Sequence, residues 1–133
     1  MVKKILFFIF LISGLGFNDN SFKKEQLKFG RVRAAYSEKW SAVKGKLLKA
    51  GIDTSHFELF IRAFKREAEL EVWARSNKAQ YKLVETYAIC SSSGELGPKR
   101  RQGDGQVPEG FYHVSVFNPT SSYHLSLGIN YPN

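Results

Sequence analysis

The chain has 133 residues, of which 43% are hydrophobic and 14% aromatic, and its formal net charge is +8. This length fits one domain, and this composition supplies a modest core. The single cysteine, Cys90, excludes an intramolecular disulfide.

The positive charge is concentrated in the N-terminal third of the chain. Between Lys23 and Lys49 there are nine Lys and Arg residues and two Glu residues. Such a surface is either a solvated helix face or a site that attracts anionic lipid or an anionic cell-wall polymer. We do not expect nucleic-acid binding, because the basic residues are not interleaved with aromatic residues and form no recognised module.

The first 16 residues have the pattern of a secretory signal peptide. Lys3 and Lys4 form a positive start, Ile5 to Ile12 form an apolar core, and Gly14 and Gly16 are the small residues that a signal peptidase reads. The apolar run is shorter than the roughly 20 residues that span a bilayer. We therefore predict export to the periplasm or cell envelope. An uncleaved signal that keeps the chain near the membrane is the alternative.

A basic leader over 17–30 and a helix over 31–56 follow. The leader is polar and offers little to bury. Apolar residues then recur at spacings of three and four, which places them on one helical face, and Gly51 stands where a helix would end. This apolar face is expected to pack on a sheet, with partner binding as the alternative. Its residues are Val32, Tyr36, Trp40, Val43 and Leu47.

The remainder of the chain, 57–133, predicts five strands. Alternating apolar residues indicate strands over 57–63, 70–74, 81–89, 111–117 and 123–129. Short turns separate most of these strands. We therefore predict a mainly β, mostly antiparallel α+β fold with one N-terminal helix.

A long loop from Ser93 to Tyr112 interrupts this pattern. Its density of Gly and Pro residues indicates specific turns, and a loop of this length in a small domain is uncommon unless it is functional or disordered. Aromatic and aliphatic residues flank it on both sides, so we interpret it as a shaped functional loop. Its turn-forming residues are Gly94, Gly97, Pro98, Gly103, Gly105, Pro108 and Gly110.

The segment from Ala88 to Asn133 resembles the L,D-transpeptidases of bacterial cell walls, which have a YkuD-type catalytic domain, and in particular their YafK-like branch. The resemblance implies an L,D-transpeptidase-like β-sandwich or barrel and a cysteine thiolate that attacks peptidoglycan stem peptides. An amine would resolve the acyl-enzyme to a crosslink, and water would hydrolyse it. The matching motifs are Ser93–Lys99, Gly103–Gly105, Pro108–Tyr112, Asn118-Pro119 and Tyr131–Asn133.

The resemblance also implies a His-Gly pair and a Ser-x-Gly-Cys motif after Tyr131–Asn133, and the 133 residues contain neither. We therefore expect 57–133 to be an incomplete catalytic domain, and the chain to be a truncated and inactive member of the family. The alternative from another class is a non-catalytic module that binds cell-wall polymer through the basic helix.

A third hypothesis is a small enzyme that uses Cys90 with His113 or His124. Cys90 follows Ile89 at the end of a predicted strand, where a lone cysteine is usually a small buried hydrophobe. His113 and His124 lie on neighbouring predicted strands and could face each other across a cleft. We predict no metal and no cofactor, because the histidines are scattered and lack spaced partners.

Four residues are predicted to bind substrate. Lys99 and Arg101 lie beside Asp104 at a charged loop tip that could hold the carboxylates of a stem peptide, although a solvated loop explains it equally well. Tyr112 belongs to the segment that the resemblance places in the cleft wall, and His124 lies inside the matched region. The predicted partners are therefore peptidoglycan stem peptides or another anionic cell-wall polymer.

Overall fold

The structure is a computed structural model of the chain, and it describes residues 19–132. The predicted signal peptide at 1–16 lies outside the described residues. The elements are α1 (Asp19–Gln26), α2 (Gly30–Lys49), β1 (Glu58–Phe64), β2 (Glu69–Arg75), β3 (Lys82–Ala88), β4 (Val114–Asn118) and β5 (Ser126–Ile129).

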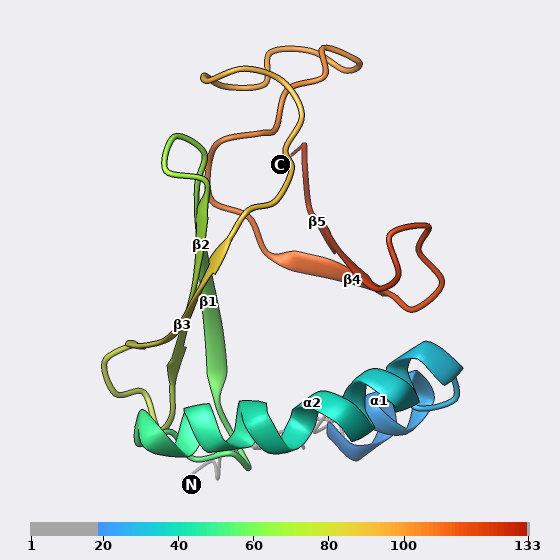
Figure 1. Cartoon of the computed structure of the whole chain (residues 1–133), viewed down its shortest axis with the longest axis vertical. Helices are drawn as coiled ribbons and strands as arrows, with labels where there is room; N and C mark the ends of the chain where they lie inside the picture. Colours follow the sequence, from blue (N-terminus) through green and yellow to red (C-terminus); the bar gives the residue numbers. More distant parts are fainter. Residues whose placement is uncertain (1–18, 133) are drawn as a thin grey trace, which may run out of the picture.

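The five strands form two antiparallel sheets, β1-β2-β3 and β4-β5. Figure 1 shows α2 across one end of the three-stranded sheet, the long loop beyond its other end, and the β4–β5 hairpin to one side. The predicted mainly β, antiparallel α+β fold is confirmed. Within residues 19–132 the two sheets do not close into a barrel.

The β1-β2-β3 sheet follows the alternation in the sequence. Leu59 lies opposite Ala74 and Ile61 opposite Val72, so these apolar residues share one face of the sheet. The predicted turn after β2 is present, with Asn77 and Lys78 in the left-handed conformation that a tight hairpin requires.

The helix α2 meets this sheet at one end. Leu47 is buried with Ile52 and Ala74, while Ala50, Phe57 and Val84 pack around them. The helix ends at Lys49 because Gly51 adopts a φ of 71°, which glycine takes without strain. The predicted end near Gly51 is thus confirmed, and 50–56 is a turn and loop rather than helix. Only the C-terminal end of the apolar stripe, at Leu47, reaches the core.

Much of the apolar face of the three-stranded sheet is open to solvent. Leu59 is 55% exposed and Ile61 is 40% exposed, and Tyr87, opposite Leu70, is 49% exposed. A contiguous apolar surface of this kind normally lies against another layer of structure. The described residues therefore form an open arrangement with a small core.

The helix α1 lies where the sequence predicts a leader with little to bury. Lys23 and Lys24 in its last turn suit the negative end of the helix dipole. Its Phe22 ring packs edge-on against Phe117 of β4, with 4.9 Å between ring centroids. Phe22 nevertheless remains 50% exposed, so this contact covers only part of its ring.

A second link joins the helices to the hairpin. The guanidinium of Arg31 donates to the carbonyl oxygens of Ser121 and His124, at 2.7 and 3.1 Å. Ser121 is buried, and its hydroxyl accepts from the N–H of Tyr123. This hydrogen-bonded turn delays the start of β5 from the predicted residue 123 to Ser126.

Candidate functional site

The long loop between β3 and β4 has no regular secondary structure, yet polar side chains from the loop and from the β1–β2 turn shape it. It extends beyond the end of the three-stranded sheet in Figure 1. Irregular backbone needs side-chain partners for its N–H and C=O groups. Three side chains supply them: Asp104, Gln106 and Lys65.

The carboxylate of Asp104 organises the loop tip. One oxygen accepts from the Lys99 ammonium at 2.5 Å and from the N–H of Gln106 at 3.0 Å. The other oxygen accepts from the N–H groups of Arg100 and Arg101, at 2.8 and 3.0 Å. The Lys99 contact, followed by the backbone donors, holds the pKa of Asp104 well below its usual value. Asp104 is therefore ionised at neutral pH, and its carboxylate holds the loop tip in one conformation.

Gln106 closes the loop across its base. Its side-chain oxygen accepts from the N–H of Glu95 at 2.7 Å. Gly94 has a φ of 75°, and a Cβ atom there would lie 2.0 Å from the Gln106 side-chain oxygen and 2.8 Å from the carbonyl oxygen of Gly105. Only glycine fits this close crossing of two backbone segments.

Lys65 braces the loop from outside. It lies in the turn between β1 and β2, and its ammonium donates to the carbonyl oxygens of Gly97 at 2.6 Å and Val107 at 3.2 Å. The same group contacts the Glu109 carboxylate at 3.0 Å, and the side chain is only 15% exposed. The ammonium thus ties both arms of the loop to the sheet. The sequence alone assigns no role to Lys65, because a lysine in a charged turn gives no sign of a distant partner.

The braced loop borders a cavity of about 430 Å³. The Asp104 carboxylate and its hydrogen-bonded partners form one wall. The cationic side chains of Arg100 and Arg101 contribute to the rim. Polar and apolar groups share its lining about equally, and the two guanidinium groups are the part that suits an anionic group. The lining residues are Leu96, Gly97, Pro98, Arg100, Arg101, Asp104 and Gln106.

The chain is similar to known proteins over part of its length. The chain is 43% identical over 77 residues to "Putative L,D-transpeptidase YafK" of Escherichia coli strain K12, and equally to the protein of that name in E. coli O157:H7. The chain is related to the YafK-like L,D-transpeptidases. The similar segment is 56% of this chain and 31% of those proteins, so the chain spans about a third of the relatives' length. No family model matches, and no solved structure matches.

The structure brings three of the four predicted substrate-binding residues into the long loop. Lys99 is engaged by Asp104 and is 15% exposed, whereas Arg101 is exposed on the cavity rim. Tyr112, at the loop's end, packs edge-on against Tyr131 at 5.9 Å, and its hydroxyl donates to the carbonyl oxygen of Glu109. Tyr112 therefore joins the base of the loop to the end of the described chain.

The fourth predicted residue, His124, lies elsewhere. It occupies the β4–β5 turn with a φ of 76°, where its carbonyl oxygen accepts from Arg31. His113 lies at the other end of that hairpin, where its N–H donates to the Asn130 side chain. Several strand residues separate the two histidines, so they do not face each other across a cleft. The strand assignment that placed them side by side is wrong, because the turn extends to Leu125.

Cys90 lies just after β3 and is exposed, so the interpretation of Cys90 as a buried hydrophobe is wrong. Its sulfur lies 3.9 Å from the carbonyl oxygen of Ala88. Within 19–132, no group of three or more His, Cys, Asp or Glu residues has an arrangement that could hold a metal ion. In the same range no helix is long and apolar enough to cross a membrane.

Proposed function

We propose that this chain supplies the substrate-recognition part of a peptidoglycan L,D-transpeptidase, with the loop from Ser93 to Tyr112 as the recognition element. The observation that carries the proposal is the braced loop with its arginine-rimmed cavity, in a chain related to YafK-like L,D-transpeptidases. In the resembled family, a cysteine thiolate attacks a stem-peptide carbonyl next to the terminal D-alanine. The ligand of this loop is then a stem peptide of peptidoglycan, in an exported protein of the periplasm or cell envelope.

The charges of the loop support an anionic ligand. Asp104 already accepts from the Lys99 ammonium, so Lys99 positions the loop more than it faces a ligand. The guanidinium groups of Arg100 and Arg101 lie on the cavity rim, and their backbone N–H groups are held by Asp104. A planar guanidinium can bind a carboxylate through two parallel hydrogen bonds. The two arginines are therefore the groups that we assign to stem-peptide carboxylates.

We further propose that these 133 residues do not catalyse acyl transfer by themselves. The chain's single cysteine, Cys90, stands outside any Ser-x-Gly-Cys sequence, and no His-Gly pair occurs in the chain. A thiol nucleophile needs a base or cation that promotes the thiolate. The hypothesis of a small enzyme with Cys90 and His124 is not favoured, because His124 lies in the turn bound by Arg31.

Binding of a purified tetrapeptide stem, measured by calorimetry, tests the recognition proposal. The double variant R100Q/R101Q is expected to weaken binding about tenfold or more, because two charge-assisted contacts are lost. Lys39→Gln is the matched control, since Lys39 is an exposed cation on α2. Equal binding by the double variant and the unaltered chain would refute the assignment.

Intact-protein mass spectrometry after incubation with the same tetrapeptide tests the catalytic proposal. We expect no added mass on Cys90 and no release of D-alanine. A stable acyl adduct that disappears in Cys90→Ser would show that the chain is an enzyme in its own right.

The basic helices support a second candidate, a module that binds anionic cell-wall polymer. Lys24, Lys44 and Lys49 are exposed on α1 and α2. Retention on purified peptidoglycan at low salt, lost as the salt concentration rises, is the expected result. If retention survives in R100Q/R101Q, the helices rather than the loop bind the polymer.

A further inference from the structure

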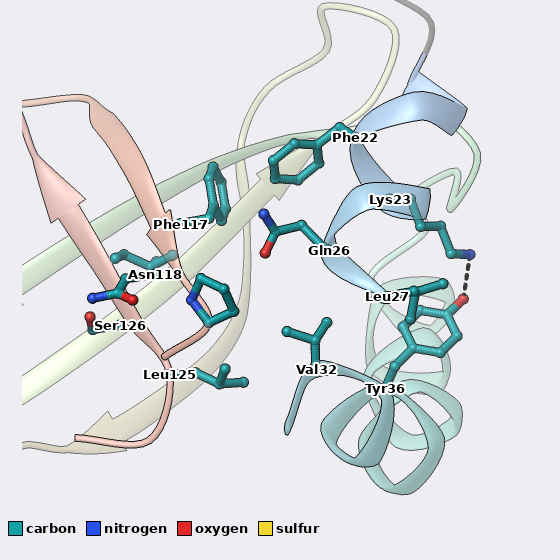
Figure 2. A pocket seen from close by; sticks show the side chains of 12 residues that line it. Phe22, Lys23, Gln26, Leu27, Val32, Tyr36, Phe117, Asn118, Leu125 and Ser126 are labelled. Carbon is teal, nitrogen blue, oxygen red and sulfur yellow. Dashed lines mark hydrogen bonds between the residues drawn. The ribbon is translucent and has the colours of Figure 1, made fainter. Parts of the chain in front are cut away.

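A second cavity, unrelated to the long loop, lies between the helices and the β4–β5 hairpin. Its volume is about 330 Å³, and its surface is almost entirely apolar. In Figure 2, Phe22 and Phe117 close one side, while Val32 and Leu125 approach each other on another. The lining residues are Phe22, Lys23, Gln26, Leu27, Val32, Tyr36, Phe117, Asn118, Pro119, Leu125, Ser126 and Leu127.

The walls of this apolar cavity are tied together at two points. The Phe22 and Phe117 rings meet at 4.9 Å and an interplanar angle of 67°. The Arg31 guanidinium joins α2 to the hairpin turn through the carbonyl oxygens of Ser121 and His124. The hairpin is thus held next to both helices, to α1 by the ring contact and to α2 by the Arg31 hydrogen bonds. The cavity is therefore preformed, as small-molecule sites usually are.

A cation stands at the edge of this cavity. The Lys23 ammonium donates to the Tyr36 hydroxyl at 2.8 Å, and it lies 4.5 Å from the centre of the Tyr36 ring. Both contacts hold the ammonium against Tyr36 at the outer edge of the cavity, and in Figure 2 the Lys23 side chain points away from Phe117 and Leu125 toward the Tyr36 hydroxyl. Lys24 of α1 and Lys28, which follows α1 and pairs with Glu25 at 2.6 Å, border an adjoining hollow. No acidic residue is among the described residues that line the cavity.

An apolar cavity with a fixed ammonium at its edge matches one kind of ligand. The alkyl chain of an amphiphile gains by leaving water, and an anionic head group gains from the nearby ammonium. We propose that this cavity binds a free fatty acid, with the alkyl chain between α1, α2 and the hairpin and the carboxylate at Lys23. This site does not depend on the function proposed for the loop.

A chain-length series of saturated fatty acids tests the proposal on the unaltered chain. Below the micelle concentration, saturable one-to-one binding is expected in calorimetry. Affinity should rise about threefold to fourfold for each added methylene, and then level off when the cavity is full. An affinity that is independent of length would overturn the proposal, as would binding only to lipid vesicles. A dimer that buries this cavity, found by sedimentation, would also overturn it.

Head-group chemistry and variants sharpen the test. Dodecanol is expected to bind more weakly than dodecanoate, and Lys23→Gln should remove that difference, which is about twofold to fivefold for an exposed ion pair. Leu125→Asp should weaken dodecanoate binding more than tenfold, with unchanged circular dichroism as the check on folding. Lys39→Gln is the matched control and should leave binding unchanged. Equal affinity for the alcohol and the acid would refute the role of Lys23.

Discussion

The long loop and the three-stranded sheet contrast in how their structure is determined. The loop from Ser93 to Tyr112 has no regular structure, yet side chains of Asp104, Gln106 and Lys65 satisfy its backbone. The sheet has regular strands whose backbone ladder is interrupted only by a shift of register at Val72 and Trp73, yet it leaves Leu59 and Ile61 substantially exposed. The irregular element is therefore the one whose backbone is held by specific side chains, whereas the regular element has an uncovered face.

This difference shows that regular secondary structure and finished packing are separate properties. A strand ladder satisfies backbone groups whether or not its apolar face is covered. A polar loop must instead bring specific side chains to specific backbone atoms to hold one shape. Substitutions in the loop should consequently have large and local effects, whereas substitutions on the open sheet face should have small effects on stability.

Gly94→Ala is expected to have the largest effect. Its φ of 75° is unfavourable for alanine, and the new Cβ would collide with the Gln106 side chain and the Gly105 carbonyl. We expect a loss of about 3–4 kcal/mol in thermal unfolding or in local amide exchange. Gly103→Ala is the matched control, because Gly103 has a φ of 77° with nothing within 4 Å of its Cβ position. That control should cost about 1–2 kcal/mol. An equal loss of stability in Gly94→Ala and Gly103→Ala would show that Gly94 does not pass close to Gln106 and Gly105.

Lys65→Met should destabilise the loop next most. The change leaves the carbonyl oxygens of Gly97 and Val107 without their donor, and it removes the contact with Glu109. A cost of about 1–3 kcal/mol is expected. Faster amide exchange should be confined to the loop, while β1 and β2 keep their protection. Arg66→Met, at the exposed neighbouring position, should change neither. Uniform loss of protection across the sheet would contradict a local brace.

Acid should loosen the loop tip at Asp104. The folded pKa of this carboxyl is below its ordinary value of 3.8, chiefly because of Lys99. Its stabilising effect is therefore complete above about pH 4 and is lost as the pH falls through the folded pKa. A carboxyl-carbon NMR titration should show Asp104 still ionised when most other carboxyls are protonated. Asp104→Asn should remove the acid-dependent loosening of the tip. A titration of Asp104 at its ordinary pKa would show that its carboxylate does not hold the loop tip through these contacts.

Leu59→Lys on the open sheet face should have the smallest effect on stability. Because Leu59 is 55% exposed, a change within about 0.5 kcal/mol is expected in the unfolding free energy. Self-association should decrease, since charge on an open sheet discourages pairing between chains. Light scattering measures this, with Thr86→Lys on the opposite face as control. Unchanged self-association in Leu59→Lys would show that the chains do not associate through this face of the sheet.

Local sequence patterns predict the five strands, α2 and the long loop. Alternation of apolar residues placed all five strands to within a few residues, because side chains point to opposite faces in turn. The period of the stripe that ends at Leu47, followed by Gly51, placed α2 and its end. The density of glycine located the long loop, and the charged tip around Asp104 was visible as a cluster. All of these signals are local.

Tertiary structure decided which distant residues meet. Lys65 reaches Gly97 and Val107, and Arg31 reaches Ser121, across 32 to 90 positions of sequence. A lysine or arginine has the same local pattern whether it is solvated or bound to distant carbonyl oxygens, so its sequence context could not reveal these roles. The same reason explains why the sequence does not predict the contact of Phe22 in α1 with Phe117. Partners for charged and apolar side chains depend on how the elements pack, and local periodicity does not contain that information.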